Sequence, residues 1–228
     1  MLGLLARRKD ALDGLAQSLG VPNATYAADV AEVAAMQAAA EDFMARHGVP
    51  DVVIANAGVS AGTSGGEAED LAVLERILRT NVVGLAASLQ PFVAPMRARG
   101  AGILAGIASV AGFRGLPGAG AYSGSKAAAI AWLESLRIEL SGSGVAVVTL
   151  CPGYIDTPMT RVNRHPMPFM LPAGEAARRM ARAIDSRRSW AVVPWQMAIV
   201  GGLMRRMPNW LYDRALKRAP RKPRKLPL

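Results

Sequence analysis

Short apolar segments alternate with longer amphipathic segments along most of the chain. The short segments are rich in Val, Ile, Leu and Ala, which is typical of strands buried on both faces of a parallel sheet. The longer segments repeat apolar residues at helical spacing and are rich in Ala and Leu. This alternation predicts an α/β fold in which crossover helices cover both faces of a parallel sheet.

The pattern gives approximate boundaries for these elements. The predicted strands cover residues 2–6, 25–28, 52–55, 102–109, 145–150 and 190–194. The predicted helices cover residues 9–19, 31–47, 67–79, 82–99, 122–140 and 174–186. We expect Pro91 and Pro95 to bend or break the helix at 82–99, because proline lacks the backbone donor that a helix interior needs.

Length and composition fit one domain with a large core, since the chain has 228 residues of which 51% are hydrophobic. The alternating pattern extends over residues 1–195. Residues 196–218 are expected to form amphipathic helices. Residues 219–228, which are rich in Pro, Lys and Arg, are expected to form a disordered tail. The single cysteine, Cys151, excludes an intramolecular disulfide and is expected to be a buried apolar residue.

The net charge of +10 is concentrated in the C-terminal part, where residues 161–228 hold 16 Lys and Arg against 3 Asp and Glu. From Trp195 onward these cations are interleaved with Trp, Met, Leu and Ile. That composition is typical of helices packed on a domain, and it also suits peripheral contact with an anionic membrane surface. Nucleic-acid binding is the third and least favoured interpretation. The apolar stretch 190–204 is shorter than the roughly 20 residues needed to span a bilayer.

The richest chemistry lies in Tyr122-Ser123-Gly124-Ser125-Lys126. If a helix begins near Tyr122, Lys126 lies one turn further along the same face. A nearby cation favours the phenolate and lowers the pKa of a tyrosine below its usual value of about 10, which makes Tyr122 a candidate acid or base. Ser109 follows a predicted strand, and functional groups of parallel sheets gather at such carboxyl ends.

Several motifs, in a fixed order, make residues 1–195 resemble the short-chain dehydrogenase/reductase family. A Tyr-x-x-x-Lys pair alone is common on helix surfaces, so the combination carries the resemblance. The matching residues are Asp29-Val30, Asn56-Ala57-Gly58, Asn81, Ser109, Tyr122, Lys126 and Pro152-Gly153-Tyr154-Ile155-Asp156-Thr157.

The resemblance implies a Rossmann-type, doubly wound parallel sheet and hydride transfer between a nicotinamide cofactor and a carbonyl or alcohol substrate. It implies that Tyr122 gives a proton to the substrate oxygen or takes one from it, and that Ser109 orients this oxygen. It also implies that Lys126 holds the cofactor ribose and that Asn81 positions a water for a proton relay. The cofactor contacts it assigns are Asp29, Val30, Asn56, Ala57, Gly58, Tyr122, Lys126, Pro152, Gly153, Ile155 and Thr157.

The end of the first predicted strand bears on the choice of cofactor. In a dinucleotide fold an acidic residue there binds the ribose hydroxyls of NAD, whereas a basic residue accommodates the 2′-phosphate of NADP. Here the strand at 2–6 is followed by Arg7 and Arg8. We therefore expect NADP(H), with Arg7 as the main contact, and keep NAD as the alternative.

One part of the family pattern has no counterpart in this sequence. The family opens with a strand, a Gly-rich turn and a helix that receive the cofactor pyrophosphate, and the strand at 2–6 matches its second strand. We expect the functional protein to carry about 30 further residues ahead of Met1, one strand-turn-helix unit. The same gap motivates an alternative function, a truncated, non-catalytic or membrane-surface binding protein that cannot hold the cofactor.

Further expectations concern partners and location. The helix at 122–140 carries more apolar residues than one face buries, and the family commonly pairs this helix symmetrically, so we expect a homodimer or homotetramer. The start of the chain lacks the pattern of a secretory signal, which indicates a cytoplasmic location, with peripheral attachment to a membrane as the alternative. His47 and His165 lack metal-ligand spacing, so no metal site is expected. The resemblance implies that segment 159–172 closes over the substrate, and its apolar residues then indicate a hydrophobic substrate; an apolar segment packed into the core is an equally good interpretation.

Overall fold

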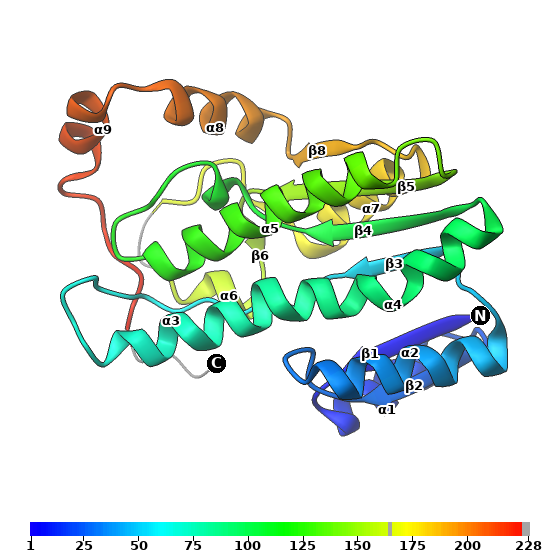
Figure 1. Ribbon diagram of the computed structural model, residues 1–228. Coiled ribbons are helices and arrows are strands. Elements are labelled where there is room, and N and C mark those ends of the chain that lie inside the picture. The colour runs from blue at the N-terminus through cyan, green and yellow to red at the C-terminus, as the bar shows by residue number, and fades with distance from the viewer. Residues whose placement is uncertain (164–165, 225–228) are drawn as a thin grey trace.

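A parallel sheet of four strands forms the centre of the structure (Figure 1), a computed structural model that describes residues 1–163 and 166–224. In spatial order its strands are β3 (Val52–Ala55), β4 (Gly102–Ile107), β5 (Val145–Pro152) and β8 (Trp190–Val193). All neighbouring pairs of this sheet are parallel, so the carboxyl ends of its strands lie at one edge. The predicted α/β fold class with a parallel sheet is confirmed.

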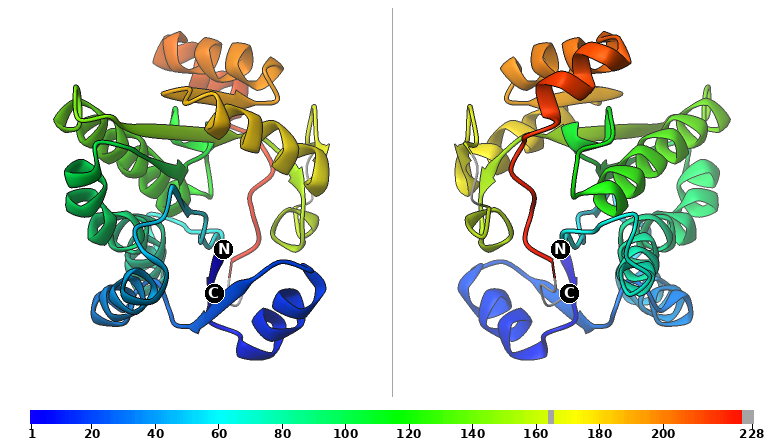
Figure 2. Two further views of the ribbon diagram at one scale, coloured as in Figure 1. Left: turned by 90° about the vertical axis from the view of Figure 1, so that its right-hand side faces the viewer. Right: turned by 90° about the vertical axis from the view of Figure 1, so that its left-hand side faces the viewer.

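A second parallel pair, β1 (Leu2–Ala6) and β2 (Asn23–Ala27), is separate from the central sheet. Figures 1 and 2 show this pair, with α1 (Lys9–Ser18), set apart from β3. Residues of β1 and of β3 line the same cavity, so the two strands face each other without pairing.

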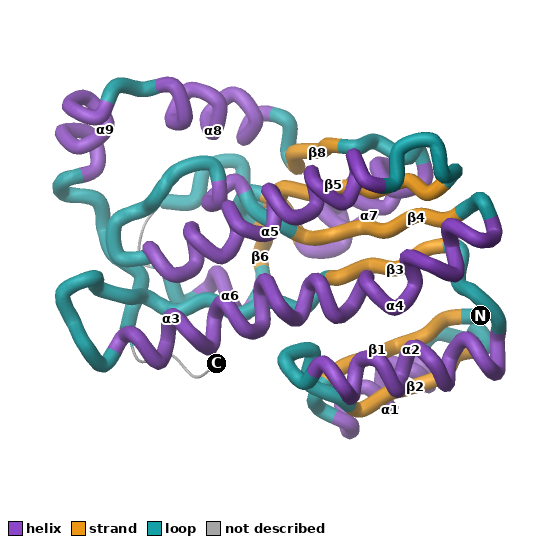
Figure 3. The backbone as a smooth tube through the Cα atoms, in the orientation of Figure 1, coloured by secondary structure: helices purple, strands orange, loops and turns teal. Residues whose placement is uncertain are grey.

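Helices cover both faces of the central sheet (Figure 3). On one face α4 (Gly84–Arg99) and α5 (Gly120–Glu139) pack around Leu104 of β4, which has no exposed surface. On the other face α7 (Ala173–Asp185) packs on Ala105. Neighbouring residues of a strand point to opposite faces, so one strand supplies both cores. Burial of a residue such as Leu104 contributes about 1.5–3 kcal/mol to stability.

One continuous helix replaces the two helices predicted at 67–79 and 82–99. α3 (Asp70–Leu78) runs through the π-helical turn η1 (Arg79–Val83) into α4. Pro91 and Pro95 lie inside α4 and do not break it, because its packing on the sheet offsets the lost hydrogen bonds. By length and composition alone this helix could cross a membrane, but here it forms one layer of the α/β core.

The C-terminal part folds back on the domain. After β8 come α8 (Gln196–Arg206) and α9 (Asn209–Leu216), in agreement with the helices expected in 196–218, and the chain then returns toward α3 (Figure 2). The Gly62 amide donates to the Pro223 carbonyl at 2.9 Å, and Arg224 Nε lies 2.9 Å from Oδ2 of buried Asp70. Residues 219–224 are thus held by the domain, in contrast to the disordered tail that we expected. Residues 225–228 lie outside the described part of the chain.

Candidate active site

Two of the predicted catalytic side chains meet beyond the carboxyl end of β4. Ser109 follows this strand and caps the short helix η2 (Val110–Gly112), since its Oγ accepts a hydrogen bond from the Ala111 amide at 3.1 Å. α5 begins at Gly120, which places Tyr122 in its first turn. The Ser109 and Tyr122 side chains are hydrogen-bonded to each other. A substrate oxygen at this point can therefore contact both hydroxyl groups.

Lys126 lies one helical turn beyond Tyr122 and has 4% of its surface exposed. Its Nζ donates to the Ile107 carbonyl at 2.8 Å and lies 5.9 Å from the centre of the Tyr122 ring. Burial lowers the pKa of Lys126 from 10.5 to about 8, because the charged form loses its contact with water. The group is therefore still mostly protonated at pH 7. Of its three N–H donors, two are left beyond the bond to Ile107.

The pKa of Tyr122 differs from our expectation in its direction. Burial raises it above 10.0, because the phenolate would be poorly solvated, and the hydrogen bond with Ser109 lowers it only in part. The Lys126 ammonium does not offset the burial, since it is bound to the Ile107 carbonyl and lies 5.9 Å from the centre of the ring. The pKa of the tyrosine is therefore raised rather than lowered in this structure, contrary to our expectation, and the neutral phenol is its dominant form at neutral pH.

Asn81 lies in the turn η1 and has no exposed surface. Its Oδ1 accepts a hydrogen bond from the Val59 amide at 2.8 Å, and its Nδ2 donates to the Val59 carbonyl and to the Ser125 hydroxyl, both at 3.0 Å. The π-helical turn replaces regular helix at this functional position. The side chain ties the loop after β3 to α5, and both of its N–H groups are occupied. Asn81 therefore fixes the position of this loop against α5, and its two N–H donors are not available to a water.

The loop after β3 passes very close to these side chains. A Cβ atom at Gly58 would lie 3.3 Å from Asn81 Oδ1 and 3.4 Å from Lys126 Nζ, tighter than an ordinary contact. Glycine at this position lets the Asn56-Ala57-Gly58 backbone approach the catalytic group. This is the physical reason for a glycine at the end of the motif.

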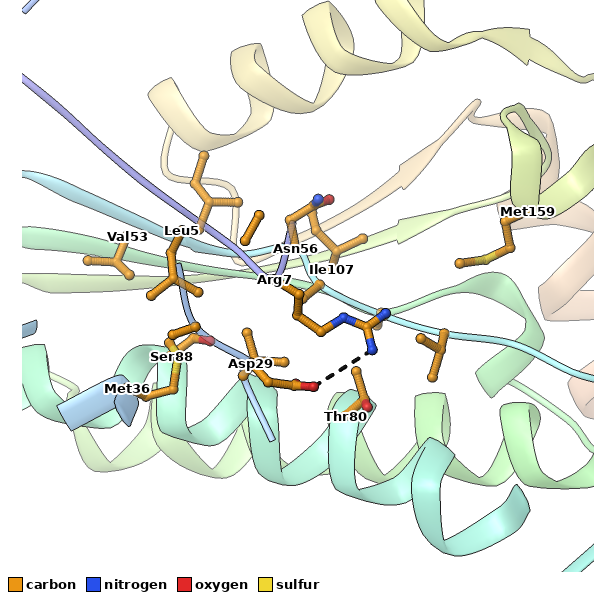
Figure 4. A pocket seen from close by; sticks show the side chains of 18 of the residues that line it. Leu5, Arg7, Asp29, Met36, Val53, Asn56, Thr80, Ser88, Ile107 and Met159 are labelled. Atoms are coloured by element: carbon orange, nitrogen blue, oxygen red, sulfur yellow. Dashed lines mark ion pairs between the residues drawn. The ribbon is translucent and has the colours of Figure 1, made fainter. Parts of the chain in front are cut away.

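A cavity of about 1140 Å³ connects the catalytic group with the end of β1 (Figure 4). Ser109, Tyr122 and Lys126 line it, whereas Asn81 is not among its lining residues. The lining also includes all the predicted cofactor residues, namely Arg7, Arg8, Asp29, Val30, Asn56, Ala57, Gly58, Pro152, Gly153, Ile155 and Thr157. Residues from six separate segments of the chain therefore converge on one space.

The cavity fits a dinucleotide in size and in the character of its two ends. Its volume lies slightly above that of ordinary ligand pockets, about 300–1,000 Å³, and includes the space between β1 and β3. Proton-transferring groups lie at one end, and Arg7, Arg8 and Asp29 at the other. The described residues that line it include no Gly-rich turn opening a helix, so the usual anion site for a pyrophosphate is not formed by them.

Arg7 and Asp29 are paired with each other, and Figure 4 shows the Arg7 side chain directed toward Asp29. Arg7 Nη1 lies 3.7 Å from Asp29 Oδ2, and both side chains are substantially exposed, so the pair is weak. Asp29 Oδ1 also accepts a hydrogen bond from the Ala31 amide at 3.0 Å, which fixes the turn after β2. Arg7 can therefore leave Asp29 at little cost for a more strongly charged partner.

Thr157 and Cys151 have roles that the sequence did not suggest in full. Thr157 lines the cavity, but it also caps the short helix α6 (Pro158–Arg161) through reciprocal bonds with Thr160. Cys151 is fully buried, as expected, and burial raises the pKa of its thiol to about 12. The thiol is therefore protonated and unreactive at neutral pH.

The segment in which we expected substrate contacts contributes Met159 to the cavity, whereas the sequence did not indicate a contribution from the tail. Lys222, far along the chain, donates to Ser60 Oγ at 2.9 Å and reaches the Met159 carbonyl at 3.5 Å. The returning tail therefore bridges the loop after β3 and the short helix α6. His165, in the segment expected to contact substrate, lies outside the described residues.

Comparison with known proteins gives a consistent result. A family model described as short chain dehydrogenase matches residues 2–168. An uncharacterized oxidoreductase of Myxococcus xanthus is 37% identical over 208 residues, which cover 91% of this chain and 82% of that protein. A 2-(R)-hydroxypropyl-CoM dehydrogenase of Xanthobacter autotrophicus is 34% identical over 136 residues, covering 59% of this chain and 54% of that protein.

Solved structures share the fold. A short chain dehydrogenase/reductase from Burkholderia phymatum, in complex with NAD, superposes with a TM-score of 0.78 at 24% identity, covering 98% of this chain and 88% of that one. A 3-ketoacyl-(acyl-carrier-protein) reductase from Brucella melitensis, complexed with NADH, gives a TM-score of 0.76 at 23% identity, covering 84% and 85%. At these identities the likeness concerns the fold alone.

Proposed function

The chain belongs to the short-chain dehydrogenase family and is an oxidoreductase acting on CH–OH or C=O groups, and from that premise we propose that it transfers a hydride between NADP(H) and a hydrophobic carbonyl or alcohol substrate. The observation that carries the proposal is the single cavity that joins Ser109, Tyr122 and Lys126 to Arg7 and Asp29. It offers a proton donor at one end and a basic contact for a nucleotide at the other.

The protein's own part in this reaction is to orient the substrate and move one proton. When bound, the nicotinamide supplies or accepts the hydride. Ser109 Oγ orients the substrate oxygen beside the Tyr122 hydroxyl, with which it is hydrogen-bonded. In carbonyl reduction the neutral phenol of Tyr122 gives its proton to that oxygen. The raised pKa of Tyr122 keeps this form dominant at neutral pH, which favours reduction over alcohol oxidation there.

Lys126 and Asn81 keep the reacting groups in place. Lys126 is fixed by the Ile107 carbonyl, and its remaining N–H donors suit the hydroxyl groups of a ribose. Asn81 acts through the Val59 backbone and Ser125, and so sets the distance between the loop after β3 and the first turns of α5. A misplacement of about 1 Å in such a site costs about 10²-fold in rate.

We assign NADP(H) rather than NAD(H) on the basis of charge. Arg7 and Arg8 follow β1 at the cavity end opposite Tyr122, and the weak, exposed pair of Arg7 with Asp29 leaves the guanidinium free to bind a 2′-phosphate. An acidic residue that would select the NAD ribose is not found at these two positions. The hydrophobic substrate is inferred from Met159, which lines the cavity, and from the neighbouring Phe169 and Met170.

Two measurements test this function. Fluorescence titration of the protein should show tighter binding of NADPH than of NADH, and Arg7→Asp should narrow or reverse the preference, while the exposed control Arg97→Asp should leave it unchanged. Equal affinities in the wild type contradict the cofactor assignment. A panel of apolar ketones and aldehydes, followed by NADPH absorbance, should show turnover. Absence of both cofactor binding and turnover would favour the non-catalytic alternative, which cannot hold the cofactor.

A further inference from the structure

The last two helices carry a row of large apolar side chains that face solvent. These residues, which we call the C-terminal apolar stripe, are Trp195, Ile199, Leu203 and Trp210. The first three have 64% of their surface exposed and Trp210 has 70%. Trp195, Ile199 and Leu203 are spaced by four residues, so they lie on one side of α8. Figure 1 shows α8 and α9 along the outer edge of the structure, beyond β8.

The opposite side of α8 is firmly attached to the domain, which fixes the direction of the stripe. Met197 is buried, and a Cβ atom at Gly201 would lie 2.4 Å from Phe113, so the helix is packed closely there. The Arg114 guanidinium bonds the carbonyls at the end of α8, and the Tyr212 hydroxyl of α9 donates to the Gly115 carbonyl at 2.7 Å. The exposed stripe is therefore a feature of the packed fold and not of a frayed end.

The stripe is accompanied by unneutralised positive charge. Between residues 195 and 224 the chain has eight Lys and Arg and one acid, Asp213. Arg205 and Arg206 are exposed in the last turn of α8, and Arg206 follows Leu203 by three residues on the stripe side of the helix. Within the described part of the chain, Arg224 is the cation of this segment that forms ion pairs.

We propose that this face of α8 and α9 docks on an anionic lipid surface. The two tryptophans and the apolar stripe suit the headgroup level of a bilayer, and the arginines and lysines suit lipid phosphates. A second copy of the chain fits less well, because a symmetric contact would bring the two clusters of cations together. A nucleic acid would pair with the cations but leave the apolar stripe in water.

The test is vesicle flotation with the full 228-residue chain. The protein should float with vesicles of phosphatidylcholine mixed with phosphatidylglycerol, less so in high salt, and not with phosphatidylcholine alone. The double variant Ile199→Gln/Leu203→Gln should reduce binding about ten-fold or more, since two apolar side chains lose their burial. Arg205→Gln and Arg206→Gln should each reduce it about five-fold.

Leu71→Gln provides the matched control, because Leu71 is 65% exposed but lies in α3, away from the stripe. It should leave vesicle binding unchanged. Thermal melting of each variant without lipid should match the wild type, which separates a surface effect from unfolding. Three results overturn the proposal: no flotation of the wild type with anionic vesicles, equal loss in the Leu71 control, or sedimentation showing that the Ile199/Leu203 variant abolishes self-association while vesicle binding is absent.

Discussion

Lys126 is expected to serve the reaction as a buried ammonium, and burying this charge should lower the stability of the folded protein. This loss of stability can be measured. Folding lowers the pKa of this lysine from 10.5 to about 8, so keeping it charged at pH 7 costs about 3 kcal/mol. Below pH 8 the lysine is protonated in both states and the folded protein bears the full cost. Between about pH 8 and 10.5 the folded state loses the proton first, so the cost falls as the pH rises. The free energy of unfolding of the wild type should therefore increase with pH over this interval, as the cost of burying the charge disappears.

Lys126→Met removes the charge and keeps a long, flexible side chain. The free energy of unfolding of the variant should lack this increase with pH. Its stability relative to wild type should therefore be higher at pH 7 than at pH 10.5. The net gain at pH 7 should be below 3 kcal/mol, because the Ile107 carbonyl loses a charged hydrogen bond worth about 1.5–3 kcal/mol. Turnover should fall sharply, since the ammonium beside Tyr122 is gone.

The assay is urea unfolding of wild type and variant at several pH values, analysed by linear extrapolation. Lys9→Met is the control, since Lys9 is an exposed lysine paired only with Asp13. Its stability difference from wild type should be small and show no rise between pH 8 and 10.5. If Lys126→Met and wild type change in parallel with pH across this interval, the buried ammonium does not carry the cost derived above.

The remaining predictions concern the loops, the proton donor, the tail and the assembly. Asn81→Ala should lower stability by about 2–4 kcal/mol, because buried groups of Val59 lose their partners, while Asn23→Ala should cost about 1 kcal/mol or less; chemical unfolding measures both. Below about pH 8, where Lys126 keeps its proton, alcohol oxidation should rise about ten-fold per pH unit and carbonyl reduction should stay flat, because the raised pKa of Tyr122 preserves the phenol; a pH–rate profile in both directions checks this. Arg224→Glu should release the tail and speed its cleavage by trypsin, and unchanged cleavage speaks against the ion pairs with Glu69 and Asp70. Ultracentrifugation should show a dimer or tetramer, as proposed from α5, and a monomer at micromolar concentration would count against it.

Much of the fold could be predicted because its signals are local. The strands at 52–55 and 145–150 are apolar runs bounded by turns, and the structure places strands there. The four-residue spacing of Tyr122 and Lys126 puts them on one side of α5, whatever the rest of the chain does. Likewise, Ser109 follows a strand and so lies at the edge where these residues meet.

The parts that could not be predicted depend on contacts between distant segments. The π-helical turn at Asn81 forms where Val59 and Ser125 require the side chain, and neither partner is near it in sequence. The tail looks disordered by composition, yet Lys222 bonds Ser60, 162 residues away. The direction of the Tyr122 pKa depends on how completely the fold removes water, which spacing alone does not reveal.

The most direct test of the proposed function is the turnover of a carbonyl substrate with NADPH by Tyr122→Phe, compared with Tyr26→Phe. Both tyrosines line the cavity, but the Tyr26 hydroxyl is bound to Asp42 and Arg46 and lies on β2, away from the catalytic group. Tyr122→Phe should bind NADPH like wild type and lose about 10²–10⁴-fold in kcat, the usual share of a positioned proton donor. Tyr26→Phe should retain kcat. If Tyr122→Phe turns over at the wild-type rate, Tyr122 is not the proton donor and the proposed mechanism is wrong.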